Sequence, residues 1–152
     1  MSLIIATGAN LGLPLVQLEL AKAELQQHFE LIAQSRIYKS SAVDYENQPD
    51  FYNQVLEFKL PTISPEETIH LLLEIEKKLG RTREIFRGPR LIDIDIIFWG
   101  QERLELEFLV IPHPRWDQRS FVVRPLQELP FFKTIEKCFT IPKSFEVEAF
   151  PV

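Results

Sequence analysis

Residues 91–99 constrain this chain more than any other segment, because apolar and acidic side chains alternate there over the length of a strand. Successive side chains of a strand point to opposite faces of its sheet. One face is predicted to consist of Ile92, Ile94, Ile96 and Phe98. Asp93 and Asp95 then share the other face, with Cα atoms ~6.6 Å apart. The segment is predicted to bury one face and to present two neighbouring carboxylates on the other.

Asp93 and Asp95 have two interpretations. Like charges in an otherwise apolar strand repel each other and resist removal from water, and a bound cation would relieve both effects. Carboxylate oxygens suit a hard ion such as Mg²⁺, which completes its coordination with water and substrate phosphates. Two ions about 3.5–4 Å apart could also be held. In the alternative, the aspartates lie on the solvent face of an edge strand and bind nothing.

A cluster of arginines precedes this strand and consists of Arg81, Arg83, Arg87 and Arg90. Guanidinium groups bind phosphate oxygens through paired N–H groups, so arginines and carboxylates together predict a site for a polyphosphate and its metal. The net charge of −5 argues against a nucleic-acid partner. No glycine loop of the P-loop type is present, so arginines and metal would have to hold a nucleotide. The alternative for this segment is an ordinary solvated loop.

Other candidate residues are weaker when taken singly. His113 lies between two prolines and could donate to a phosphate oxygen, although an isolated histidine is more often a structural turn residue. Phe51 and Phe121 could form two walls of an aromatic slot, with Asn53 on the same strand face as Phe51. The alternative is that both aromatics belong to the core.

The order of predicted elements defines the fold class. Strands are predicted at 3–6, 31–39, 51–60 and 91–99, and helices at 14–29 and from Pro65 to a stop at Gly80. Ser64 and Glu67 form a capping box before the second helix. This β-α-β-β-α-β order is typical of a ferredoxin-like α+β fold, an antiparallel sheet with helices packed on it.

Both helices would cover one face of that sheet, and a ligand or the C-terminal additions would take the other. These additions are predicted to be short helical turns over 112–129 and a hairpin around 142–144. The polar segment 40–49 is a loop long enough to be functional.

Length and composition predict one domain, residues 1–152, with a substantial core, since 45% of residues are hydrophobic. No apolar run reaches the length of a membrane span, and the N-terminus lacks the features of a signal peptide. The single cysteine, Cys138, suits a reducing compartment. We therefore expect a cytoplasmic protein that binds neither membrane nor nucleic acid.

Taken together, these residues resemble the 6-hydroxymethyl-7,8-dihydropterin pyrophosphokinase family. The most specific stretch is RGPRLIDIDII at residues 87–97. Supporting matches are GANLG at 8–12, QPDFYN at 48–53, EIE at 74–76, GRTR at 80–83, IPH at 111–113 and RSF at 119–121. The resemblance implies transfer of pyrophosphate from ATP to the hydroxymethyl group of the pterin, with release of AMP, in folate biosynthesis. It also implies a monomer whose partners are small-molecule substrates.

The resemblance further implies roles for individual residues. Asp93 and Asp95 would hold two Mg²⁺ ions and, with Arg81 and Arg90, carry the catalysis. The implied ATP contacts are Arg81, Arg83, Arg90, Ile96 through its backbone, His113 and Arg119. The implied pterin contacts are Ser40, Ala42, Val43, Phe51, Asn53 and Phe121.

The chain departs from the family pattern in three places. Residues 40–43 are SSAV where a Thr-Pro-Pro-like loop is usual, and residues 86–87 are FR where an Arg-Trp pair is usual. Phe108 and Val110 stand where relatives often carry arginine and threonine. Two alternatives to an active enzyme follow. One is a nucleotide- and metal-binding homologue that has lost pterin activity, and the other is a ferredoxin-like interaction module.

Overall fold

The structure is a computed structural model and describes residues 1–41, 48–80 and 91–152. The strands are β1 (Ser2–Ala9), β2 (Leu31–Gln34), β3 (Tyr38–Ser40), β4 (Phe51–Lys59), β5 (Asp93–Trp99), β6 (Leu104–Leu106), β7 (Leu109–Ile111) and β8 (Phe150–Pro151). The helices are α1 (Pro14–Gln26), α2 (Pro65–Lys78), α3 (Ser120–Leu126), α4 (Phe132–Cys138) and a 3-10 turn at Trp116–Gln118. No helix within these ranges has the length and apolar character needed to cross a membrane.

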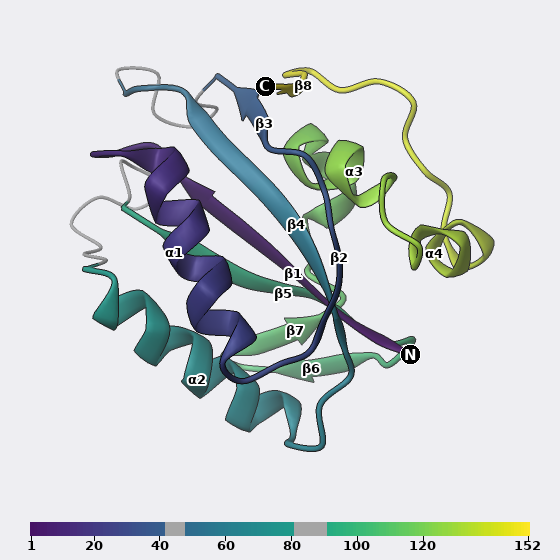
Figure 1. Cartoon of the computed structure of the whole chain (residues 1–152). Helices are drawn as coiled ribbons and strands as arrows, with labels where there is room; N and C mark the ends of the chain where they lie inside the picture. The colour runs from purple at the N-terminus through teal and green to yellow at the C-terminus, as the bar shows by residue number, and fades with distance from the viewer. Residues whose placement is uncertain (42–47, 81–90) are drawn as a thin grey trace.

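The main sheet has the strand order β5-β1-β4-β3-β8, and β2 also pairs with β4. β1 pairs antiparallel with both β4 and β5 and lies between them. α1 and α2 lie together on one face, and α3 and α4 lie on the other (Figure 1). The predicted ferredoxin-like fold is confirmed. The C-terminal helices take the face that the sequence left open, and β6 and β7 form an additional antiparallel pair.

The two ends of α2 follow directly from local sequence. Ser64 Oγ accepts the N–H of Glu67, and the Glu67 carboxylate accepts the N–H of Ser64, each at 3.1 Å. After the helix, Gly80 has a φ of +87°, which glycine adopts without a side-chain clash, and its N–H donates to Lys77 O. The predicted capping box and helix stop are both present, so the position of α2 along the chain is set locally.

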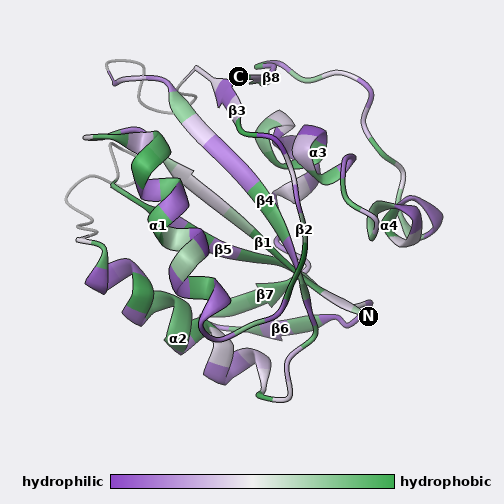
Figure 2. Cartoon of the chain, in the orientation of Figure 1, coloured by the Kyte–Doolittle hydropathy of each residue, from purple (hydrophilic) through white to green (hydrophobic). Residues whose placement is uncertain are grey.

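Two hydrophobic cores lie on the two faces of the sheet. The core beneath α1 and α2 includes Leu3, Ile5, Leu25, Leu56, Phe58, Leu72, Ile94 and Ile96. The core beneath the C-terminal helices includes Ile4, Val55, Ile97, Phe98, Trp116, Val123, Leu126 and Ile135. β4 is hydrophilic over part of its length toward β3 and hydrophobic further along (Figure 2). On the face of the C-terminal helices, Val55 of β4 belongs to the second core, and the side chain before it on that face is the polar Asn53. The second core therefore fills one end of this face, and the other end is polar.

The strand predicted over 31–39 is interrupted between β2 and β3. At the break, Ser35 Oγ accepts the backbone N–H of Val55 at 3.0 Å, and Gln54 Nε2 donates to Ser35 O at 2.8 Å. Side chains thus replace part of the regular ladder with β4, and the chain bends there.

The prediction for Phe98 was also wrong. A register shift between β1 and β5 pairs Ile5 with Ile96 but Ile4 with Phe98, which leaves Ile97 as an extra residue. A bulge of this kind changes the alternation of side chains. Phe98 therefore joins Ile97 in the core beneath the C-terminal helices, on the face opposite to Ile96.

The predicted hairpin around 142–144 is wrong as well. The backbone of this segment is held by side chains of α3, since Arg124 Nη2 donates to Lys143 O at 2.8 Å and Ser120 Oγ donates to Val147 O at 2.6 Å. The last residues then form β8, which pairs with β3. Because these partners are distant in sequence, a local turn pattern could not identify them.

Candidate active site

One row of residues crosses the polar end of the sheet. Gly8 of β1 pairs with Asn53 of β4 on one side and with Asp93 of β5 on the other. In the neighbouring row, Ala6 pairs with Asp95. Residues directly opposite each other in antiparallel strands place their side chains on the same face. Asn53, Asp93 and Asp95 therefore share the sheet face that the C-terminal helices partly cover.

Asp93 and Asp95 are both half-buried on this face. The N–H of Ile94, which lies between them, donates to Glu76 Oε2 at 2.7 Å and so ties the outer edge of β5 to α2. Within residues 1–41, 48–80 and 91–152, no three His, Cys, Asp or Glu side chains are grouped as metal ligands. Two carboxylates fit a hard ion that takes its remaining ligands from water and phosphate, rather than a closed structural site.

His113 lies beside the same strand. The backbone N–H of His113 donates to Ile97 O at 3.0 Å, and the ring Nδ1 of His113 accepts the backbone N–H of Arg115 at 3.1 Å. Burial and the positive charge of Arg119 lower the pKa of His113 to about 4, although Asp93 acts in the opposite sense. The imidazole is therefore neutral at pH 7 and carries its proton on Nε2. A neutral donor of this kind can bind a phosphate oxygen.

Arg119 and Phe121 lie at the start of α3, which packs against β3 and β4. The Arg119 guanidinium carbon is 5.6 Å from the centre of the Phe121 ring. Phe121 is half-buried at the edge of the second core, and Phe51 is half-buried at the start of β4. The fold therefore brings α3, with its arginine and its aromatic ring, onto the face that carries Asn53.

Asn53 and Ser40 have buried polar atoms with unused hydrogen-bonding capacity. Asn53 is 8% exposed and Ser40 is 5% exposed. Asn53 Nδ2 donates weakly to Thr7 O at 3.4 Å. Asn53 Oδ1 and Ser40 Oγ have no hydrogen-bond partner within the part of the chain that the structure describes. Because a buried polar atom without a partner is costly, these two atoms mark a place where a polar ligand would be stabilising.

Ile96 buries its side chain in the core beneath α1 and α2, away from the two aspartates, as predicted. Its backbone N–H and C=O groups lie in the plane of the sheet, not on the face that buries its side chain. The N–H of Ile94 is directed to Glu76 outside the sheet, and alternate residues of a strand direct their backbone groups to the same side. The backbone of Ile96 therefore lies on the outer edge of β5, where the sequence predicts contact with ATP.

Several predicted site residues lie outside the described residues. These are Ala42 and Val43 of the pterin loop and Arg81, Arg83 and Arg90 of the arginine cluster, together with residues 86–87. Their roles stay predictions.

The sequence-based prediction gave no role to two residues that support the site. Glu76 is 3% exposed. The sequence feature that could have identified it is an acidic residue on the apolar stripe of α2, four residues after Leu72. Asn10 is also buried, and its Nδ2 donates to Gln48 Oε1 at 2.7 Å and to Pro49 O at 3.0 Å. Asn10 thereby holds the segment that leads into Phe51. The sequence feature that could have identified it is a polar residue directly after a buried strand, within the GANLG stretch at 8–12.

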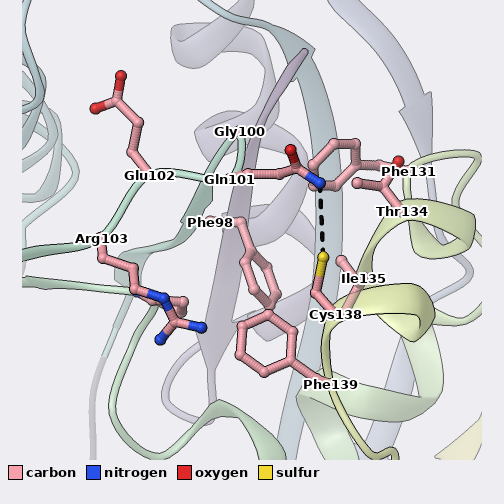
Figure 3. A pocket seen from close by; sticks show the side chains of 11 residues that line it. Phe98, Gly100, Gln101, Glu102, Arg103, Phe131, Thr134, Ile135, Cys138 and Phe139 are labelled. Atoms are coloured by element: carbon pink, nitrogen blue, oxygen red, sulfur yellow. Dashed lines mark hydrogen bonds between the residues drawn. The ribbon is translucent and has the colours of Figure 1, made fainter.

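A small pocket of about 60 Å³ lies at the opposite end of β5, beyond Phe98 (Figure 3). Its lining combines aromatic and aliphatic side chains with Arg103 and Cys138. Gln101 Nε2 donates to Cys138 Sγ at 3.5 Å across it. None of its lining residues is a predicted site residue, so the candidate active site is the polar face around Asn53, Asp93 and Asp95.

Comparison with known proteins gives the family. The family model described as 7,8-dihydro-6-hydroxymethylpterin-pyrophosphokinase (HPPK) matches residues 4–130, a range that contains every predicted site residue. The chain belongs to this family. It is a pyrophosphokinase that transfers pyrophosphate to hydroxymethyldihydropterin in folate synthesis, with ATP as co-substrate.

Individual relatives agree with this assignment. The chain is 42% identical over 127 residues to the 2-amino-4-hydroxy-6-hydroxymethyldihydropteridine pyrophosphokinase of Bacillus subtilis (strain 168), covering 82% of this chain and 75% of that one. The protein of the same name from Aquifex aeolicus (strain VF5) is 35% identical over 122 residues, covering 80% and 76%. The folic acid synthesis protein fol1 of Pneumocystis carinii is 37% identical, but the match covers only 17% of that protein.

Solved structures support the fold. A Plasmodium falciparum HPPK-DHPS mutant crystallised with pteroate superposes with a TM-score of 0.61 at 14% identity, over 83% of this chain and 39% of that one. At this level of identity the likeness concerns architecture alone.

Proposed function

We propose that this pyrophosphokinase depends on Mg²⁺, and that Asp93 and Asp95 hold two ions against the phosphates of ATP. The observation that carries the proposal is the pairing of Gly8 with Asn53 on one side and Asp93 on the other. Two carboxylates and a buried amide thereby adjoin on one sheet face. A phosphate end and a pterin end of one active site would meet there.

Bound Mg²⁺ would neutralise phosphate oxygens and orient the hydroxymethyl group for in-line attack. The hydroxymethyl oxygen of the pterin would attack the β-phosphorus of ATP and release its proton to water, while the bond from that phosphorus to the oxygen of the α-phosphate breaks and AMP leaves with that oxygen. His113 would donate its Nε2 proton in a hydrogen bond to a phosphate oxygen without adding a charge. Arg81, Arg83, Arg90 and Arg119 would stabilise the negative charge that develops on the leaving AMP.

The pterin would lie at the Asn53 end of the face. The unpartnered Oδ1 of Asn53 can accept a hydrogen bond from an N–H of the ring, and Ser40 Oγ can donate to or accept from it. Phe51 and Phe121 would stack on the two sides of the ring. Ala42 and Val43 would complete the slot from the loop before β4. Backbone groups of Ile96 would contact the adenine at the outer edge of β5.

The proposal extends to the state and location of the protein. We propose a cytoplasmic monomer that binds neither membrane nor nucleic acid. The single cysteine and the net charge of −5 support this. Gel filtration with light scattering would give the mass in solution, and a dimer at micromolar concentration would contradict the monomer.

The test is AMP formation from ATP and 6-hydroxymethyl-7,8-dihydropterin while Mg²⁺ is titrated. Asp93→Asn and Asp95→Asn should each lower the rate by at least about 100-fold, because a metal-bound phosphoryl group gains several kcal/mol of charge stabilisation. Glu102→Gln, an exposed acid beyond the far end of β5, is the matched control and should keep the wild-type rate. AMP formation that persists in EDTA, or in both aspartate variants, would refute the proposed metal site.

A further inference from the structure

We propose that the C-terminal brace, defined as residues 143–152, positions the two walls of the pterin slot relative to each other. The brace ties α3, which carries Phe121, to β3, which carries Ser40. This inference rests on the proposed roles of these two residues. The family match ends at residue 130, so the brace lies beyond it.

The brace is attached to α3 by side chains of that helix. Ser120, next to Phe121, donates its hydroxyl to Val147 O at 2.6 Å. Arg124, one turn further along, donates to both oxygens of Glu148, at 3.0 and 3.3 Å, and to Lys143 O at 2.8 Å. The hydrogen bond from Arg124 lowers the pKa of the Glu148 carboxyl, which agrees with a maintained ion pair. One face of α3 is therefore fixed to the brace at three points.

The end of the brace is attached to β3 through the backbone. Tyr38 pairs with Pro151 and Lys39 with Phe150, and the N–H of Val152 donates to Ile37 O at 2.9 Å. Ala149, between the two attachments, is 4% exposed. The brace therefore spans without a break from α3 to the outer edge of the sheet.

β3 needs this second partner because it is short. It has three residues, and its inner edge pairs only with the first residues of β4, Ser40 opposite Phe51. A three-residue edge strand with one neighbour opens easily, whereas pairing on both edges holds its register. The last residues of the brace also line, with Ser40, an open pocket of about 330 Å³. A movement of the brace would therefore change the surroundings of Ser40 directly.

A second set of hydrogen bonds, which does not involve the brace, limits how far β3 would move if the brace were lost. The Tyr38 hydroxyl donates to Glu128, two residues after the end of α3, and Arg36 Nε donates to the same carboxylate at 3.0 Å. This contact does not involve the brace, so β3 keeps one attachment to α3 without it. Loss of the brace should loosen the Ser40 end of β3 and leave the fold standing.

The test compares substrate affinities in a chain that ends at Glu148 and therefore lacks β8. Pterin binding would be measured by calorimetry with Mg²⁺ and a non-hydrolysable ATP analogue present. We expect pterin affinity to fall by about tenfold, because the ligand must then order a loose wall of its own slot. Affinity for the ATP analogue, measured alone with Mg²⁺, should stay within about twofold of wild type, since the deleted β8 lies at the opposite end of the strand order from β5. Glu146→Gln is the matched control, because that side chain of the brace is exposed and does not line the pocket beside Ser40.

A second variant keeps the chain at full length. Glu148→Gln removes the charge that binds Arg124, and we expect about a threefold loss of pterin affinity with the nucleotide affinity unchanged. Unchanged pterin affinity in a folded truncated chain, or in Glu148→Gln if the truncated chain does not fold, would overturn the proposal. A parallel loss of both affinities would also overturn it, because that indicates general destabilisation. A wild-type chain that binds no pterin would refute the proposed function itself, and the role of the brace with it.

Discussion

Asn53 lies over Gly8, so close that a Cβ atom built on Gly8 would be 2.4 Å from Asn53 Nδ2. The side chain of Asn53 keeps its position on the active face only because its neighbour on β1 has no side chain. Gly8 is therefore a requirement of the site rather than of the strand, in which most residues would fit better than glycine.

Gly8→Ala should displace Asn53 and weaken pterin binding. We expect KM for the pterin to rise about tenfold, the equivalent of one lost hydrogen bond to a buried group. KM for ATP should change much less, and steady-state kinetics with each substrate varied would show the difference. The double variant Gly8→Ala/Asn53→Ala is the control. It should bind pterin no better than Gly8→Ala but recover part of its stability, because the clash is gone. Equal KM changes for both substrates would contradict this account.

His113 should make stability depend on pH in the metal-free protein. Its pKa is about 4 in the folded chain, against 6.5 for the unperturbed group, so between these values the unfolded chain binds more protons. Stability therefore falls as pH drops from 6.5 towards 4. His113→Gln should lose less Tm than wild type between pH 7 and 5, as scanning calorimetry in EDTA would measure. An identical loss in both proteins would show that His113 does not contribute.

The stability that two carboxylates contribute, Glu128 and Glu148, changes at lower pH and does not interfere with the comparison between pH 7 and 5. Burial acts in the opposite sense, but hydrogen bonds from Arg36 and Tyr38 lower the pKa of Glu128 below 4.5, and the hydrogen bond from Arg124 does the same for Glu148. Their stabilisation is complete above pH 4.5 and is lost as pH falls below it.

Glu76 should matter for stability and for the metal site together. Glu76→Ala leaves the buried N–H of Ile94 without this acceptor, which should cost about 1–3 kcal/mol of unfolding free energy. Since Ile94 separates Asp93 from Asp95, the Mg²⁺ concentration for half-maximal activity should also rise. Glu76→Gln retains an oxygen acceptor and should lose less on both counts. Urea unfolding and Mg²⁺ titration would measure the two effects, and a Gln variant as impaired as the Ala variant would show that the charge matters more than the hydrogen bond.

Ser64→Ala should affect stability alone. The capping box at the start of α2 is intact, and its loss should cost about 1 kcal/mol in urea unfolding. The kcat/KM should stay at the wild-type value, because the cap is at the end of α2 remote from Glu76. Thr62→Ala, an exposed residue before the cap, should change neither. A large loss of activity in Ser64→Ala would show that loss of the cap displaces the whole of α2, including Glu76 at its other end.

The sequence by itself determined the features whose causes are local. Alternation over residues 91–99 placed Asp93 and Asp95 on one face, and the capping box and Gly80 set the ends of α2. The order of elements then identified the ferredoxin-like fold, and the motifs around these elements identified the family. Each of these signals depends on residues within a few positions of one another, so no knowledge of distant contacts was needed.

Only the tertiary structure decided the rest. The row from Asn53 through Gly8 to Asp93 depends on the registers of two strand pairs, which join residues 45 positions apart (8 and 53) and 85 positions apart (8 and 93). Three further features also depend on contacts between residues distant in sequence. They are the bulge that moves Phe98 to the opposite face, the role of Glu76 as a hydrogen-bond acceptor and the pairing of β8 with β3. In each case a long-range hydrogen bond replaces the partner that local pattern suggests. A backbone group needs a partner, and sequence neighbours alone do not reveal which one the folded chain supplies.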